Sequence, residues 1–120
     1  YLLRDGSLTR LTRDHSLVEE LVQQGKLTPE EASTHPQRSV ITRAVGPESA
    51  VEVDTQTTSA RDGDVFLICS DGVTDMVEEQ EICRILAHNE DVGDCVDLLI
   101  QAALDGGGKD NITAIVVRME

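Results

Sequence analysis

The order of elements along the sequence predicts a layered domain of the α/β or α+β class. Strand-like pairs occur at residues 2–8 and 51–70, helical patterns follow each pair, and the apolar run at residues 112–117 indicates a last strand. Asp-Gly pairs or runs of glycine punctuate these segments, as turns do. Elements in this order bury one face each and stack as helices on a sheet.

A hairpin and two short helices are expected near the start of the chain. Asp5-Gly6 lies between two short apolar runs and favours the tight turn that joins twisted strands. Each helix is predicted from a capping box, in which the cap side chain and a glutamate three residues later both accept from backbone amides. The signals are Ser16, Glu19 and the stop Gly25 for residues 17–24, and Thr28, Pro29 and Glu31 for a helix to about Ser33.

Residues 34–50 have little regular pattern, apart from a short strand-like run at residues 40–42. They contain His35-Pro36 and Gly46-Pro47, which favour turns or extended chain. We therefore expect residues 14–50 to form a flap segment, and loops of this kind often carry substrate contacts.

A strand pair and two helices are expected in the second half. Residues 51–59 alternate well enough for a strand with one buried face, and a turn at residues 61–64 leads into an apolar strand over residues 65–70. Two amphipathic helices follow. Their predicted apolar faces are Ile82, Ile85 and Leu86 in the first, and Val92, Val96, Leu99, Ile100 and Ala103 in the second.

The chain is strongly acidic, because 23 Asp and Glu against 10 Lys and Arg give a formal net charge of −13. This charge repels phosphate backbones and argues against nucleic-acid binding, whereas it attracts divalent cations. Three isolated cysteines with no C-x-x-C pair fit a reducing compartment. No apolar run approaches the roughly 18 residues of a membrane span, and no signal peptide precedes the first strand, so a cytoplasmic location is expected.

Two acidic residues lie where apolar strands begin or end. Asp71 follows six uncharged residues, and Asp75 comes four positions later. Asp110 lies between a run of glycines and the last apolar strand. Carboxylate oxygens are the ligands that Mg²⁺ and Mn²⁺ prefer, so the pairing predicts a hard-cation site. The other Asp-Gly pairs, at Asp5, Asp62 and Asp105, are interpreted as turns.

Other roles are open for several of these residues. Asp110 has an alternative role as a cap of the turn after the glycines, and Asp75 as a cap of the turn or helix that follows it. Asn111 is interpreted as a partner that holds Asp110 in place. Neither histidine of the flap is assigned a catalytic role: His15 is expected to be packed or hydrogen-bonded there, and His35 to belong to a turn.

Several motifs resemble the C-terminal half of the metal-dependent type 2C (PPM) serine/threonine protein phosphatases, particularly the compact bacterial type. They are residues 64–75 (DVFLICSDGVTD), residues 108–113 (GKDNIT), and flap stretches at residues 14–17 (DHSL) and 35–46 (HPQRSVITRAVG). The resemblance covers essentially the whole chain. It implies an α+β fold, a β-sandwich flanked by helices in αββα layers, of which residues 1–120 are the C-terminal part and residues 14–50 a flap.

The resemblance also implies a chemistry. Asp71 and Asp110 match two metal-ligand aspartates that help to hold a pair of Mn²⁺ or Mg²⁺ ions, and Asp75 matches a position associated with a third, weaker metal. The implied reaction is hydrolysis of phosphoserine and phosphothreonine in proteins by a metal-activated water. The implied partners are phosphoprotein substrates of serine/threonine kinases, in signalling.

Parts of the family's catalytic machinery are absent from residues 1–120. The Asp-Gly-x-Gly-Gly motif, a second early acidic motif and a phosphate-binding arginine do not occur in them. The chain, which starts at Tyr1 inside a strand-like run, is therefore interpreted as a fragment that is a poor catalyst alone. Half a sandwich exposes strand edges and apolar faces, so we expect the missing N-terminal half or self-association to cover them.

Two alternative functions remain. The first is a truncated or degenerate phosphatase-like module for binding or assembly. The second is an unrelated receiver-like or flavodoxin-like domain, but a receiver needs an acidic pair at an earlier strand end, and Asp5 lies in the predicted hairpin.

Overall fold

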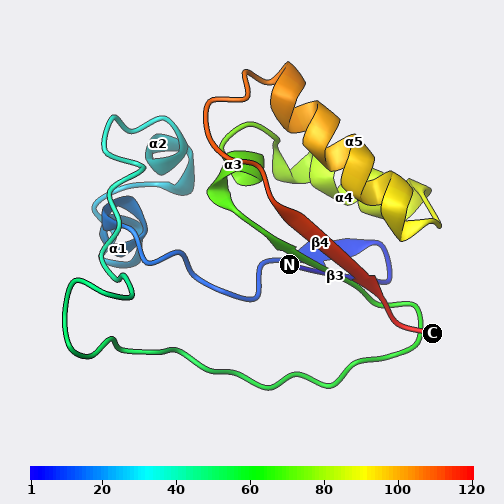
Figure 1. The fold of residues 1–120 in the computed structure, drawn as a ribbon, viewed down its shortest axis with the longest axis horizontal. Helices are drawn as coiled ribbons and strands as arrows, with labels where there is room; N and C mark the ends of the chain where they lie inside the picture. The colour runs from blue at the N-terminus through cyan, green and yellow to red at the C-terminus, as the bar shows by residue number, and fades with distance from the viewer. The chain divides into compact units, whose positions relative to one another are not determined.

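The computed structural model describes all 120 residues, which form two compact units (Figure 1). The first unit consists of Tyr1–Leu11 and Ser59–Glu120, and the second of Thr12–Thr58. The second unit contains residues 14–50, the segment expected to be a flap.

A four-stranded antiparallel sheet forms the base of the first unit, with the strand order β2-β1-β3-β4. The strands are β1 (Leu2–Arg4), β2 (Ser7–Thr9), β3 (Val65–Cys69) and β4 (Ala114–Arg118). β1 and β2 form the predicted hairpin, and Asp5 and Gly6 at its tip have φ angles of 51° and 77°. Both positive values are typical of the tight turn that an Asp-Gly pair favours.

Three helices follow β3 in the chain: α3 (Asp71–Thr74), α4 (Glu79–His88) and α5 (Val92–Asp105). Figure 1 shows α4 and α5 side by side against one face of the sheet. Helices gathered on one face of an antiparallel sheet make an α+β fold. The buried residues of the resulting core are Leu3, Val65, Leu67, Val73, Val77, Ile82, Ile85, Leu86, Cys95, Leu99, Ala103 and Val116.

The buried face of α4 is the predicted one, but that of α5 is rotated from the prediction. Cys95, Leu99 and Ala103 are fully buried, whereas Val92 is exposed and Val96 and Ile100 are only partly covered. Residues four apart lie on one side of a helix, so the buried stripe is centred on Cys95 rather than on Val96. The Cys95 thiol lies within 3.5 Å of the Asn89 carbonyl oxygen, which helps to fix this orientation.

Apolar side chains also lie on the face of the β3–β4 pair opposite the helices. Ile68 and Ile115 are cross-strand partners and are 63% and 52% exposed, and Val117 is 41% exposed. Alternate residues of a strand point to opposite faces, so burial of Leu67 and Val116 under the helices places these three side chains on the other side. Within the first unit, the helices therefore cover one face of the sheet only.

The second unit contains the two predicted short helices, α1 (Leu17–Gln23) and α2 (Pro29–Ser33). In α2 both halves of the capping box form: the amide of Glu31 donates to the Thr28 hydroxyl, and the amide of Thr28 donates to the Glu31 carboxylate, each at 3.1 Å. In α1 the amide of Glu19 donates to the Ser16 hydroxyl at 3.3 Å. None of the five helices of the chain has the length and apolar character needed to cross a membrane.

Two strand predictions are wrong for this chain. Residues 40–42 make only one isolated bridge, between Ser16 and Ile41. Residues 51–59 form no strand, and every one of them is exposed. An alternating pattern becomes a strand only when a neighbouring strand offers backbone partners, and no segment of this chain pairs with residues 51–59.

Candidate metal centre

Antiparallel pairing of β3 and β4 brings the two predicted acidic segments to the same end of the sheet. The pairing extends one residue beyond the strands, because the amide of Ser70 donates to the carbonyl of Thr113 at 3.0 Å. Asp71 follows this contact directly, and Asp110 lies three residues before Thr113 on the other segment. The fold thus places the segments of Asp71 and Asp110 together, as expected for a shared site.

The Ser70 side chain ties the two segments together a second time. Its hydroxyl donates to the Asn111 carbonyl at 3.1 Å and accepts from the Thr113 amide at 3.1 Å. The hydroxyl therefore serves the cross-segment contact rather than capping α3, which begins at the next residue. Ser70 fixes the distance between the backbone that carries Asp71 and the backbone that carries Asp110.

Gly72 permits the close approach of these segments. It is buried, and a Cβ atom at this position would lie 2.0 Å from the Asn111 carbonyl oxygen and 2.8 Å from its carbonyl carbon. No side chain can occupy that space while both backbones stay in place. The sequence did not predict the roles of Gly72 and Ser70, because an Asp-Gly pair in a sequence does not show whether its glycine forms a turn or packs against the backbone of a distant segment.

Asp75 lies one helical turn after Asp71. The amide of Asp75 donates to the Asp71 carbonyl at 2.8 Å, and both residues are exposed. Residues four apart lie on the same side of a helical turn. Asp75 ends α3 through its backbone amide, and Glu78 is the N-cap of α4, so the expected role of Asp75 as a cap of the helix that follows is not found. A metal role for the Asp75 carboxylate stays a prediction.

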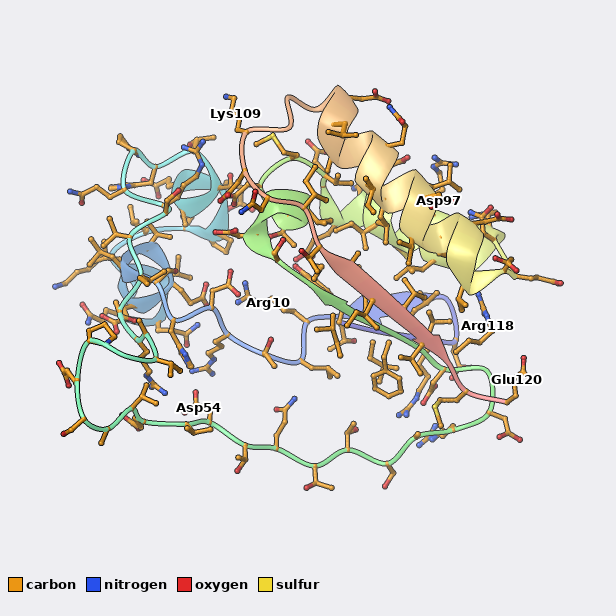
Figure 2. All side chains as sticks on the ribbon, in the orientation of Figure 1. Arg10, Asp54, Asp97, Lys109, Arg118 and Glu120 are labelled. Atoms are coloured by element: carbon orange, nitrogen blue, oxygen red, sulfur yellow. The ribbon has the colours of Figure 1, made fainter.

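The Asp110 carboxylate forms one hydrogen bond, accepting on Oδ1 from the Asn111 amide at 2.7 Å. The alternative role of Asp110 also predicts a hydrogen bond from its side chain to a nearby backbone amide, and this contact is of that kind. Asn111 thus restrains Asp110 through its backbone, and a holding role for the Asn111 side chain stays a prediction. Lys109, the preceding residue, is exposed on the loop from α5 to β4 (Figure 2).

The residues present match the chemistry of a hard-cation site but not its number of ligands. Asp71 and Asp110 offer exposed carboxylate oxygens at one sheet end, which suit Mg²⁺ or Mn²⁺. No group of three or more His, Cys, Asp or Glu side chains is arranged to hold a metal ion. These ions take about six oxygen ligands, so further ligands must come from outside this chain or from water.

The buried acid at the other end of β3 has a structural role instead. Asp64 is almost fully buried and accepts from Arg4 Nη2 at 2.6 Å, from Arg4 Nε at 2.9 Å and from the Arg61 amide at 2.8 Å. The hydrogen bonds from the Arg4 guanidinium are the main reason that the pKa of Asp64 falls to about 2. A carboxylate satisfied in this way joins β1 to β3 and is not available to a metal.

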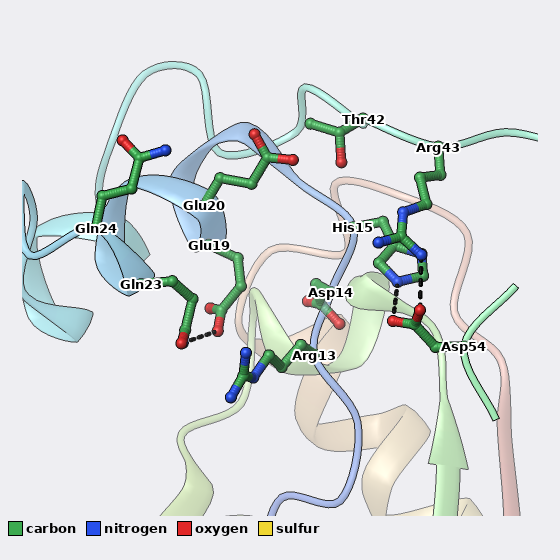
Figure 3. A pocket seen from close by; sticks show the side chains of 10 residues that line it. All are labelled: Arg13, Asp14, His15, Glu19, Glu20, Gln23, Gln24, Thr42, Arg43 and Asp54. Atoms are coloured by element: carbon green, nitrogen blue, oxygen red, sulfur yellow. Dashed lines mark hydrogen bonds and ion pairs between the residues drawn. The ribbon is translucent and has the colours of Figure 1, made fainter. Parts of the chain in front are cut away.

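The flap histidines form the local contacts expected of them. His15 Nε2 lies 2.9 Å from Asp54 Oδ2, and His35 Nδ1 accepts from the Gln37 amide at 3.0 Å, within a turn. His15 and Asp54 also line a hollow of about 290 Å³ within the second unit (Figure 3). None of the predicted metal ligands lines that hollow.

Known proteins of one family are similar to this chain. Residues 19–120 match the sequence profile of the family described as stage II sporulation protein E (SpoIIE). The chain is 47% identical over 116 residues to the serine/threonine protein phosphatase PstP of Mycobacterium tuberculosis, covering 97% of this chain and 22% of PstP. It is 43% identical over 117 residues to the serine/threonine phosphatase Stp of Listeria welshimeri, covering 98% of this chain and 46% of Stp.

Solved structures show the same fold. A serine/threonine phosphatase from S. agalactiae superposes with a TM-score of 0.91 at 40% identity, over 99% of this chain and 49% of that one. The M. tuberculosis phosphatase PstP/Ppp superposes with a TM-score of 0.90 at 46% identity, over 100% of this chain and 50% of that one. A third structure, the PstP catalytic domain in complex with two manganese ions, superposes with a TM-score of 0.80 at 43% identity, over 97% of this chain and 47% of that one.

The fold and the paired acidic segments define a protein of the PPM phosphatase class, as the motifs predicted. The chain belongs to the SpoIIE family of PPM-type domains and corresponds to about half of a serine/threonine phosphatase domain. The predicted α+β phosphatase fold is confirmed by the superpositions. The chain spans just under half the length of the Listeria relative, so the activity of the whole protein is a matter for proposal.

Proposed function

We propose that the protein to which this chain belongs hydrolyses phosphoserine and phosphothreonine in phosphoproteins, with Mn²⁺ or Mg²⁺ as its cofactor. The observation that carries the proposal is the joining of the Asp71 and Asp110 segments by Ser70 and Gly72 at one sheet end. Relatives that share this fold are serine/threonine phosphatases, and one of them was solved with two manganese ions.

Asp71 and Asp110 are the residues that would hold the metal pair, and Asp75 a weaker third ion. When bound, such ions supply an activated water and offset the negative charge on the phosphoryl oxygens. The residues of this chain position the carboxylates. Ser70 and Gly72 fix the backbones of the two carboxylates relative to each other, and the Asn111 amide orients the Asp110 carboxylate. No further residue of the chain is assigned a catalytic role.

This chain alone should be inactive, because two or three carboxylates cannot complete the metal site. By the family resemblance, the remaining ligands and a phosphate-binding arginine would come from the N-terminal half of the domain, which residues 1–120 do not include. The exposed Ile68, Ile115 and Val117 supply a surface for that half, since its docking there would remove their apolar side chains from water. Self-association over the same face is the other arrangement that would cover it.

A second candidate function is a phosphatase-like module used for binding or assembly. The incomplete ligand set of the isolated chain favours it. In either case we propose a cytoplasmic location, which three free cysteines support because reducing compartments keep thiols unpaired.

The test is metal-dependent hydrolysis. This chain is compared with a completed domain, in which the half of the M. tuberculosis PstP catalytic domain that the chain does not cover is fused before Tyr1. Hydrolysis of p-nitrophenyl phosphate and of a phosphothreonine peptide is measured with Mn²⁺ and after its removal with EDTA. We expect activity in the completed domain only, dependent on Mn²⁺.

Variants identify the residues responsible. Asp71→Asn removes a ligand charge with little change in volume and should abolish hydrolysis by the completed domain. Asp62→Asn is the matched control, because it alters an exposed Asp-Gly pair outside the site and should leave hydrolysis unchanged. Full activity in Asp71→Asn, or none in the completed domain together with no Mn²⁺ binding, would contradict the enzyme proposal and favour the binding module.

A further inference from the structure

The loop that carries Asp110, residues 106–113, runs from α5 to β4 alongside α3 (Figure 1). Near the start of α3 the loop is fixed through Asn111. A second contact fixes it just beyond the other end of α3, where Gly106 meets Met76. We call this second contact the Met76 clamp.

The Met76 clamp is a contact between backbones. A Cβ atom at Gly106 would lie 2.7 Å from the Met76 carbonyl oxygen and 3.2 Å from the Met76 Cβ. The φ angle of Gly106 is −75°, which any residue adopts, so the backbone conformation does not require glycine here. The close approach of Met76 is therefore the reason that position 106 has no space for a side chain.

Both sides of the clamp are anchored in the core. Val73 in α3 and Val77 just after it are buried, and the amide of Val77 donates to the Val73 carbonyl at 2.8 Å. On the other side, the amide of Gly106 donates to the Ala102 carbonyl at 3.0 Å, next to the fully buried Ala103 of α5. The clamp therefore joins two backbones that are each held in place.

The Met76 side chain extends the contact along the loop. Its Sδ atom lies 3.5 Å from the position that a Cβ atom of Gly107 would take. A flexible thioether side chain fills irregular gaps of this kind. Gly107 and Gly108 have φ angles of 131° and 55°, which glycine adopts without strain. These two glycines give the loop the freedom to absorb a small shift of Gly106.

A shift of the clamp therefore acts on Asp75 more than on Asp110. Met76 is the next residue after Asp75, so a displaced Met76 backbone moves Asp75 directly. Asp110 lies four residues after Gly106, beyond the two flexible glycines, and the contacts of Asn111 hold its segment independently of the clamp.

We propose that Met76 and Gly106 are positioning residues of the metal centre, which set the place of the Asp75 carboxylate and thereby the affinity for the weaker ion. The inference rests on the proposed function, in which Asp75 holds that ion. Gly106 has no side chain, and Met76 offers a thioether, which hard cations do not prefer. Each residue therefore acts through Asp75.

The test is Mn²⁺ binding by the completed domain, measured by isothermal titration calorimetry through the tight sites and then the weaker one. Asp75→Asn identifies the weaker site by removing it. Gly106→Ala displaces the Met76 carbonyl and should weaken the weaker site by about tenfold, as is typical when the support of a metal ligand is lost. The tight sites should bind Mn²⁺ as they do in the parent.

Two comparisons separate positioning from a general loss of stability. Ile85→Val removes a buried methyl group from α4, outside α3 and the loop, and should lower stability without changing Mn²⁺ affinity at any site. Met76→Ala removes the thioether and should weaken the weaker site by less than Gly106→Ala does. Met76→Leu keeps the apolar volume and should bind like the parent.

Amide exchange without metal, followed by NMR, reports the displacement itself. In Gly106→Ala the Val77 amide, which donates to Val73, should exchange about threefold faster or more than in the parent. The Thr113 amide, which donates to the Ser70 hydroxyl at the other end of the loop, should exchange as in the parent.

The outcomes are distinguishable. The proposal is overturned if Gly106→Ala binds Mn²⁺ like the parent, if it weakens the tight and weaker sites alike, or if Ile85→Val reproduces its effect. Retention of the weaker site in Asp75→Asn would also overturn it, while leaving the proposed function in place. A parent domain that binds no Mn²⁺ at all would contradict the proposed function, and this inference with it.

Discussion

Replacing Gly72 with alanine tests whether the two acidic segments depend on their close approach. The new Cβ atom would lie 2.0 Å from the Asn111 carbonyl oxygen, and ordinary contact begins at 3.4 Å, so the Asn111 backbone must retreat by about 1.4 Å. That retreat also stretches the hydrogen bond from the Ser70 hydroxyl to Asn111, now 3.1 Å long. Both effects act on backbone and cannot be relieved by rotating a side chain.

The cost follows from these two effects. Overpacking of a fixed site typically costs ~1–3 kcal/mol. A lost hydrogen bond adds ~1 kcal/mol. We expect Gly72→Ala to lower the free energy of unfolding by ~2–4 kcal/mol, which corresponds to a fall in Tm of roughly 4–16 °C for a completed domain about twice the length of this chain.

Urea and thermal unfolding of the completed domain, followed by circular dichroism, measure this change. Gly93→Ala is the control, because its Cβ would meet no backbone of another segment, only Oδ1 of the α5 cap residue Asp91 at 2.9 Å, and any loss at that cap is offset by the preference of alanine for the helix. Gly93→Ala should shift stability by no more than ~1 kcal/mol in either direction. A Gly72→Ala protein within ~0.5 kcal/mol of the parent would refute the argument from close approach.

Three further outcomes are expected. Ser70→Ala leaves the carbonyl of Asn111 without its donor and should destabilise the domain by ~1–2 kcal/mol in urea unfolding, with Ser70→Thr as a variant that keeps the hydroxyl. The Arg4 guanidinium is the main reason that the pKa of Asp64 is lowered to about 2, so the stabilising effect of Asp64 is full above the ordinary pKa of an aspartate and is lost as the pH falls toward about 2. Asp64→Asn should therefore reduce the pH dependence of the unfolding free energy in that window. An unchanged pH profile would contradict this role of Asp64. Thr28→Ala removes the cap of α2 and should cost ~1 kcal/mol locally, seen as faster amide exchange in that helix than in the parent protein.

Local signals in the sequence predicted most of the elements. Asp5-Gly6 identified the hairpin because few other pairs tolerate its positive φ angles, and the capping residues around Ser16 and Thr28 identified the starts of α1 and α2. The apolar run before Ser70 identified β3. In each case the signal that predicts the element lies within a few neighbouring residues and does not depend on a distant part of the chain.

The errors concern features that depend on distant partners. Residues 51–59 have the pattern of a strand, but pairing requires an edge that this chain does not offer. The buried face of α5 is decided by how the helix packs on the sheet. The sequence of the helix alone does not determine whether that face is centred on Val96 or on Cys95.

The candidate site was predicted in part. The positions of Asp71 and Asp110 at strand ends follow from the apolar runs beside them, and antiparallel pairing then joins their segments. The contacts of Ser70 and Gly72 with the Asn111 backbone join residues about forty positions apart, and no local pattern encodes them. Their roles required the structure.

Mn²⁺ binding by the completed domain tests the central claim most directly, because it examines the carboxylates without requiring turnover. Isothermal titration calorimetry would compare the parent with Asp71→Asn, Asp110→Asn and the turn control Asp62→Asn. The account predicts that each of the first two weakens Mn²⁺ affinity by about tenfold or more, while the control binds like the parent. Unchanged Mn²⁺ affinity in both Asp71→Asn and Asp110→Asn would contradict the assignment of this sheet end as the metal centre.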